Sequence, residues 1–196
     1  MRGTRDGCAT ASLRYDGPVD RGEVCTRLAE LRGSDPGLDR IFGGGAHGFD
    51  LAPPLSEAAV IAFESIHGIA LPDAYRAFLL KVGSTGAGPG YGLTGLPTEP
   101  AVAATLVGTC PLTRQDAEDV RRRRATGEDH AFVERVPVSG AGVLSLCDHG
   151  CGWNSYLVIS GPDRGAVWTG GELGWFPDAD DFAGWYEAWL GDPLTT

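Results

Sequence analysis

The residues with the clearest chemical potential lie in one stretch, Cys147-Asp148-His149-Gly150-Cys151, where two thiols and an imidazole fall within five residues. Thiolate and imidazole are the usual ligands of structural zinc, but such sites take four ligands, normally as two separated pairs. A second pair is missing, because Cys110 is isolated and the other histidines are scattered. We therefore expect no metal ion and no cofactor, and interpret the stretch as a tight loop between two strands with small, half-buried cysteines.

A nucleophilic role for Cys147 or Cys151 would require activation by His149. Residues two apart in a strand or a tight loop rarely present their side chains to each other for proton transfer. The sequence also contains no Gly-x-Ser-x-Gly or His-Glu-x-x-His motif. It therefore predicts a protein that is not an enzyme, with a metal- or thiol-dependent enzyme as a distant alternative.

Glycine dominates residues 83–95, a run that could cradle a phosphate. Phosphate-binding loops, however, link a strand to a helix and are followed by Lys-Ser or Lys-Thr. This run follows a predicted helix and has no such pair. We therefore expect a structural loop.

Helices are predicted in the first two thirds of the chain and a β-meander in the last third. Apolar spacing and capping residues indicate helices at about 20–32, 56–67, 72–82 and 115–124, whereas the glycine- and proline-rich stretch 43–54 is expected to exclude a helix. Short apolar runs indicate strands at 142–147, 153–160, 166–169 and 173–176. Asp181 then caps a final helix whose aromatic stripe is expected to pack on the sheet.

The formal net charge is −10, and Lys81 is the only lysine. This balance argues against a nucleic-acid partner and against an anionic membrane surface, because phosphate binding needs clustered positive charge. Four consecutive arginines, 121–124, fit a solvated helix end better than a nucleic-acid patch. The segment from Gly165 onward has six acids and no Lys or Arg, which either steers a basic partner or simply keeps the protein soluble.

Cysteine usage and hydropathy predict a cytoplasmic protein. Five cysteines at irregular spacings suit free thiols in a reducing compartment better than a disulfide framework. No apolar run reaches the roughly 18 residues of a membrane span, and the first residues lack the apolar stretch of a secretory signal.

Three stretches of the N-terminal half together resemble bacterial members of the Smi-one/Knr-four family of the SUKH superfamily: 53–64, 68–79 and 86–93. The second half is similar too, through 150–153, 157–165, 167–168 and the aromatic stripe at 182–190. Phe42-Gly43 with His47 resembles the lead-in of the family. Each piece alone is weak, and the ordered combination over roughly residues 38–191 is specific.

The resemblance implies an α+β fold with a twisted, mainly antiparallel sheet and flanking helices. It implies a single domain at 38–191, preceded by an N-terminal extension, residues 1–37, with one helix. Bacterial relatives are commonly predicted immunity proteins that neutralise a cognate toxin, often a nuclease, of a polymorphic or contact-dependent system. Fungal relatives are regulatory scaffolds, so a scaffold or regulatory interaction protein is the alternative function.

The family offers no catalytic residues to carry over, so we expect a partner-binding face built from loop residues that the core does not obviously need. These are Tyr91, Asp148, His149, Asn154, Glu172 and Trp175. The alternative for Tyr91 and Trp175 is that they pack against the core or a loop.

Overall fold

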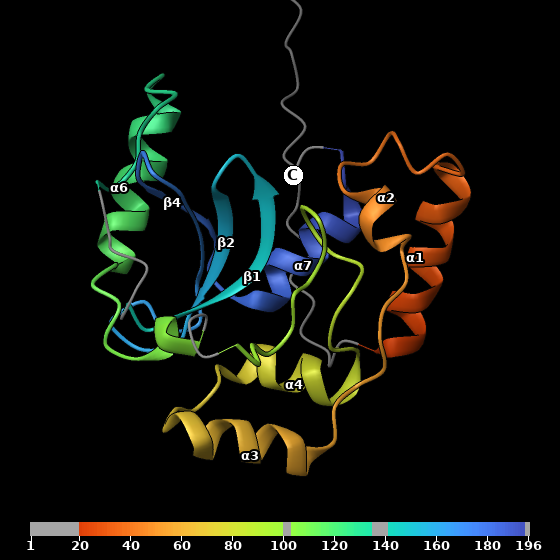
Figure 1. The fold of residues 1–196 in the computed structure, drawn as a ribbon. Helices are drawn as coiled ribbons and strands as arrows, with labels where there is room; N and C mark the ends of the chain where they lie inside the picture. Colours follow the sequence, from red (N-terminus) through yellow and green to blue (C-terminus); the bar gives the residue numbers. More distant parts are fainter. Residues whose placement is uncertain (1–19, 100–102, 135–140, 195–196) are drawn as a thin grey trace, which may run out of the picture.

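A four-stranded antiparallel sheet in the C-terminal half is the frame on which the helices pack (Figure 1). The structure, a computed structural model, describes residues 20–99, 103–134 and 141–194. The strands follow in sequence order, and their bounds are β1 Val143–Gly150, β2 Trp153–Val158, β3 Val167–Gly170 and β4 Trp175–Ala179. The predicted α+β class and the predicted meander are therefore confirmed.

Helices surround this sheet, and their ends follow the capping residues of the sequence. They are α1 Arg21–Ser34, α2 Gly44–His47, α3 Glu57–His67, α4 Asp73–Lys81, α6 Arg114–Ala125 and α7 Phe182–Gly191, with a 3-10 turn η1 at Ala104–Leu106. Ser56 accepts a hydrogen bond from the Ala59 N–H at the start of α3, and Asp181 accepts one from the Gly184 N–H at the start of α7. Such caps contribute about 1 kcal/mol each.

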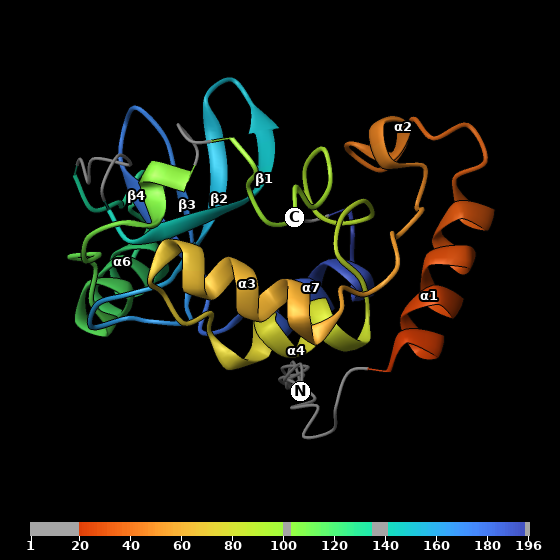
Figure 2. The same ribbon diagram turned by 60° about the horizontal axis from the view of Figure 1, so that its bottom comes forward.

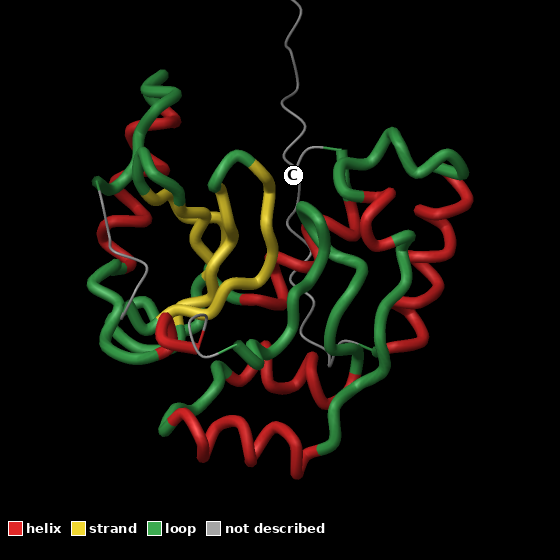
Figure 3. Tube along the Cα trace, in the orientation of Figure 1, coloured by secondary structure: helices red, strands yellow, loops and turns green. Residues whose placement is uncertain are grey.

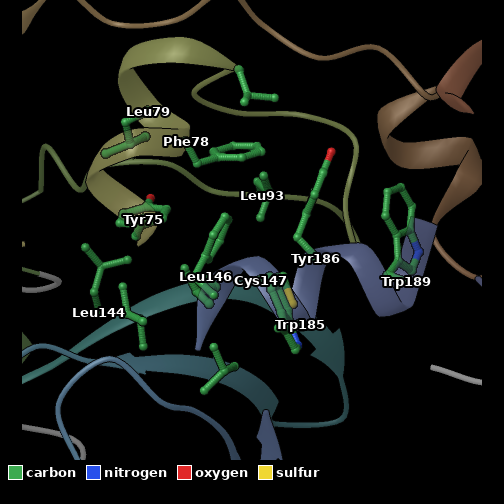
Figure 4. Close-up of a cluster of buried hydrophobic side chains, with 14 of the residues drawn as sticks. Tyr75, Phe78, Leu79, Leu93, Leu144, Leu146, Cys147, Trp185, Tyr186 and Trp189 are labelled. Atoms are coloured by element: carbon green, nitrogen blue, oxygen red, sulfur yellow. The ribbon is translucent and has the colours of Figure 1, made fainter. Parts of the chain in front are cut away.

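The main core lies where α4, α7 and β1 meet (Figure 4). Phe182 is an aromatic hub, with ring centroids 4.8 Å from Tyr75 and 4.9 Å from Phe78. Tyr186 and Trp189 extend the same buried stripe along α7. The aromatic face predicted for this helix is thus core. In Figure 1, α4 lies between α3 and α7, and in Figure 2 α3 lies in front of both, so α3 forms the outer layer.

The N-terminal extension packs into this same core over its described residues. Val24 and Leu28 of α1 are buried among the core side chains, and α1 contacts α7. Arg21 donates hydrogen bonds to the backbone carbonyls of Val82 and Ala52. Residues 1–19 of the extension lie outside the described part of the chain. The packing therefore continues across the expected boundary at residue 37.

Two expectations about local structure were wrong. The stretch expected to exclude a helix contains the single turn α2, entered through Gly43 at φ 76° and left through Gly48 at φ 56°. Glycine makes this turn possible because both flanking positions need left-handed backbone. Strand β1 is also longer than predicted and runs through Cys147 and His149 to Gly150, so the expected loop is only Cys151 and Gly152.

None of the helices within the described residues is long and apolar enough to cross a membrane.

Candidate functional site

Two turns project from one end of the sheet, which we call the hairpin end. They are the β1–β2 turn at Cys151 and Gly152 and the β3–β4 turn at residues 171–174. In an antiparallel meander, alternate turns lie at the same end of the sheet. Pairing of Asn154 with Asp148 on β1 and with Gly170 on β3 ties both turns together.

The glycine-rich loop is fastened to the free edge of β1 at this end. The Tyr91 N–H donates to the Asp148 carbonyl at 2.8 Å, and the Thr94 N–H donates to the Leu146 carbonyl at 2.9 Å. A Cβ on Gly90 would lie 2.3 Å from the Asp148 carbonyl oxygen, so only glycine allows this approach. Figure 3 shows the loop, in green, running between β1 and α2. The glycine-rich stretch therefore forms a structural loop, as expected, and it also covers the edge strand β1.

Five of the six predicted binding residues lie at the hairpin end. Asp148 and Glu172 are exposed, and His149 and Asn154 are half-buried. Tyr91 is 50% exposed and lies beside the β1–β2 turn, with its ring against Gly150. The loop and the two turns thus bring together side chains that are up to 81 residues apart in the sequence.

Trp175 does not lie on this surface. Its side chain is 1% exposed and packs at 4.8 Å from the Tyr156 ring, in a second hydrophobic cluster on the other face of the sheet from α7. The reason is strand alternation: Trp175 opens β4 on the buried face, and the next residue, Phe176, faces the opposite way and is half-buried. Trp175 is therefore a core residue, and Phe176 takes its place near the candidate site.

A polar network lies behind His149. Its Nε2 atom is 2.8 Å from Ser155 Oγ and 3.4 Å from Cys147 Sγ. Ser155 and Thr169 both donate to Asp178 Oδ2, at 3.2 and 2.5 Å. Ser155 Oγ also lies 3.0 Å from Thr169 Oγ1, so the imidazole, the two hydroxyls and the carboxylate form one connected hydrogen-bond network. The expectation that Cys147 and His149 would not present their side chains to each other was wrong, since the two side chains meet on a stretch of β1 with register irregularities just before Cys147 and at His149.

Burial sets the charge states of this network. It lowers the pKa of His149, against the opposing effect of Asp178 and Asp148, so the imidazole is held neutral. Burial raises the pKa of Asp178, and this effect is opposed mainly by the Thr169 and Ser155 hydrogen bonds, with smaller electrostatic contributions from the neighbouring His149 and Arg124 side chains. Asp178 is exposed as a residue, but its Oδ2 atom lies at the buried Ser155 and Thr169 hydroxyls, so one side of the carboxylate is shielded from water.

The geometry does not activate a nucleophile at Cys147. The residue is fully buried, and burial raises the pKa of its thiol to about 12. Its sulfur is therefore a neutral thiol at physiological pH, whereas a catalytic cysteine needs an accessible thiolate. Cys151 is exposed on the turn, away from Cys147. Within the described residues, no three His, Cys, Asp or Glu side chains are grouped so that they could hold a metal ion.

The four consecutive arginines of α6, residues 121–124, are each engaged within the chain. Arg121 pairs with Asp180 at 3.0 Å, Arg122 with Asp119, and Arg123 with Glu128. Arg124 donates to the Ala131 carbonyl at 3.2 Å, and its guanidinium carbon lies 4.4 Å from the centre of the Phe176 ring. Three of the four positive charges are thus paired with carboxylates, and the fourth guanidinium is stacked on an aromatic ring.

A cleft of about 580 Å³ opens between the hairpin end and α7. Trp153, Phe176 and Trp185 contribute aromatic surface to it, and His149, Thr169 and Asp178 contribute polar groups. Three residues here were not among the predicted binding residues: Asp178, Phe176 and the exposed Phe42, whose ring lies 5.2 Å from Tyr91. A sequence signal existed only for Phe42, an aromatic residue before a glycine run.

A model of the SMI1 / KNR4 family (SUKH-1) matches residues 54–188. The chain belongs to this family. The match covers α3, α4, the glycine-rich loop, the whole sheet and most of α7, and so includes the hairpin end and the cleft. The comparison with curated proteins found no match.

Proposed function

We propose that this SUKH protein is an immunity protein. In this proposal it acts in the cytoplasm without catalysis, by binding and neutralising a cognate toxin domain of a bacterial polymorphic or contact-dependent system. The observation that carries the proposal is the convergence of Tyr91, Asp148, His149, Asn154 and Glu172 at the hairpin end of a SUKH fold. A surface with an exposed aromatic pair, acidic groups and a cleft has the composition of a protein-binding site.

Charge supports a basic partner such as a nuclease. The chain carries a net charge of −10, and residues 165–196 contain acids but no Lys or Arg. Part of this acidic charge, at Asp148 and Glu172, is exposed at the hairpin end. Complementary charge speeds association and selects against wrong partners. The local pairing of the four arginines on α6 argues against a nucleic-acid partner.

The free thiols support a reducing compartment. Cys25, Cys110, Cys147 and Cys151 are all free. Proteins in the cytoplasm keep their thiols reduced.

The test is a pull-down with the tagged chain, with and without the neighbouring gene co-expressed, combined with a growth assay. Recovery of one basic toxin domain at equal stoichiometry, with rescue of growth, is the expected result. Capture of signalling or cell-wall proteins without any protection would contradict the immunity role and favour a scaffold.

A further inference from the structure

The cleft beside the hairpin end combines an aromatic wall with one carboxylate, Asp178, of which only one oxygen accepts hydrogen bonds from the protein. Asp178 Oδ2 accepts two hydrogen bonds, whereas Oδ1 makes none with the described residues, and Asp178 is in none of the ion pairs of that part of the chain. The cleft volume of about 580 Å³ is in the range of sites that enclose a ligand of several groups. Asp178 lines the cleft and therefore offers a carboxylate oxygen that can accept further hydrogen bonds from a ligand there.

The aromatic wall suits a cation. Trp153 and Phe176 are half-buried neighbours whose ring centroids are 5.8 Å apart. Trp185 adds a buried indole from α7. Aromatic faces attract cations, and the attraction grows when water is excluded. The chain itself provides an example, because the guanidinium of Arg124 stacks on Phe176 at 4.4 Å.

The groups that face Asp178 leave it without a fixed counter-ion. His149 on β1 is held neutral, and Ser155 and Thr169 on β2 and β3 are uncharged donors. Arg124 on α6 lowers the pKa of Asp178 through its charge, but its guanidinium donates to the Ala131 carbonyl and stacks on Phe176 and forms no ion pair with Asp178. Asp148 and Asp181 add negative charge on the neighbouring segments, whereas Asp180 is paired with Arg114 and Arg121.

We propose that the cleft receives an arginine side chain of the protein partner, with its guanidinium paired to Asp178 and stacked against the Trp153–Phe176 wall. The inference rests on the proposed function, since it names the chemistry by which the partner is recognised. Arginine fits better than lysine because its planar guanidinium stacks on rings and has several donors for one carboxylate. Arginine is also common among the residues that dominate binding energy at protein interfaces.

The first experiment uses a small probe and needs no partner. N-acetyl-arginine amide is titrated into the 15N-labelled full chain, and the indole N–H signals of Trp153 and Trp185 are followed by NMR. The matched ligand is N-acetyl-citrulline amide, which has nearly the same shape without the charge. We expect saturable shifts of both indoles with arginine, at a dissociation constant of the order of 1 mM for so small a ligand, and none with citrulline. Equal responses to both ligands, or none to arginine, would overturn the inference.

The second experiment compares two charge-removing variants. Asp178→Asn retains a carbonyl oxygen for the Ser155 and Thr169 hydroxyls, so the fold should persist. Asp180→Asn removes the same charge two residues away, where the side chain pairs with Arg114 and Arg121 on the outer surface. Saturation by the arginine probe should be lost in Asp178→Asn and kept in Asp180→Asn. Equal binding by both variants would overturn the role of Asp178, and a collapsed spectrum for Asp178→Asn would leave the citrulline comparison as the deciding result.

The same variants separate this inference from the immunity role. Once the toxin is in hand, Asp178→Asn should weaken its binding by roughly 30-fold or more, as expected when one member of an enclosed charge pair is removed. Growth rescue and toxin binding that are unchanged in Asp178→Asn would refute the arginine anchor and leave the immunity role standing. If the arginine probe binds but the pull-down captures no toxin, the arginine site in the cleft stands and the immunity role is refuted.

Discussion

Replacing Gly90 by alanine should release the glycine-rich loop from β1 and so dismantle the hairpin end. Gly90 has φ 59°, and a Cβ there would lie 2.3 Å from the Asp148 carbonyl oxygen and 3.1 Å from His149 Nδ1. Gly68, at the end of α3, is the matched control, because it has φ 64° but no atom within 4 Å of such a Cβ. The two substitutions share the backbone strain and differ only in the space available.

The magnitudes follow from these surroundings. Left-handed backbone costs an alanine about 1 kcal/mol or slightly more, which is the whole effect expected for Gly68→Ala. Gly90→Ala adds the loss of the Tyr91–Asp148 and Thr94–Leu146 backbone hydrogen bonds, each contributing about 1 kcal/mol. The expected total for Gly90→Ala is therefore about 3 kcal/mol.

Urea unfolding followed by tryptophan fluorescence measures the difference. With a slope of about 2 kcal/mol per molar urea, the midpoint should fall by about 0.5 M for Gly68→Ala and about 1.5 M for Gly90→Ala. Partner binding should be lost in Gly90→Ala and kept in Gly68→Ala. Equal midpoints with binding retained in both variants would refute the view that the loop is clamped on β1.

Three further outcomes are expected. Ser155→Ala should destabilise the fold by about 2 kcal/mol in urea unfolding, because it removes the hydroxyl that is hydrogen-bonded to both His149 Nε2 and Asp178 Oδ2; no change would argue against the network. Burial lowers the pKa of His47 and His149, so the unfolded chain binds protons that the folded chain does not. Stability should therefore be full above pH 6.5 and decline below it, with a smaller decline in His47→Asn; a flat profile would contradict this. In native labelling with iodoacetamide at pH 8, mass spectrometry should find Cys151 alkylated and Cys147 protected, and rapid labelling of Cys147 would contradict its burial.

Local sequence patterns predicted the elements that carry strong signals. Ser56 and Asp181 marked the starts of α3 and α7, because an N-cap side chain acts within three residues of itself. The aromatic stripe of α7 indicated core because four large rings on one helical face have to be buried. The turn residues of the last third separated the strands correctly.

Features that depend on long-range contacts were missed. Trp175 and Phe176 are adjacent in sequence, and only the strand register decides which of the two is buried. Asp178 becomes chemically distinctive because two hydroxyls from β2 and β3 meet its carboxylate, and no local pattern encodes that pairing. The short helix α2 was missed because its four residues begin with two glycines, which individually disfavour helix.

The most direct test of the central claim is the affinity of the captured partner for two surface variants. Tyr91→Ala removes a half-exposed ring at the hairpin end, and Ile66→Ala removes an exposed apolar side chain of α3, far from that surface. If the hairpin end binds the partner, Tyr91→Ala should weaken binding about tenfold or more and Ile66→Ala should have no effect. Full affinity in Tyr91→Ala together with lost affinity in Ile66→Ala would place the binding surface on α3 and contradict the account.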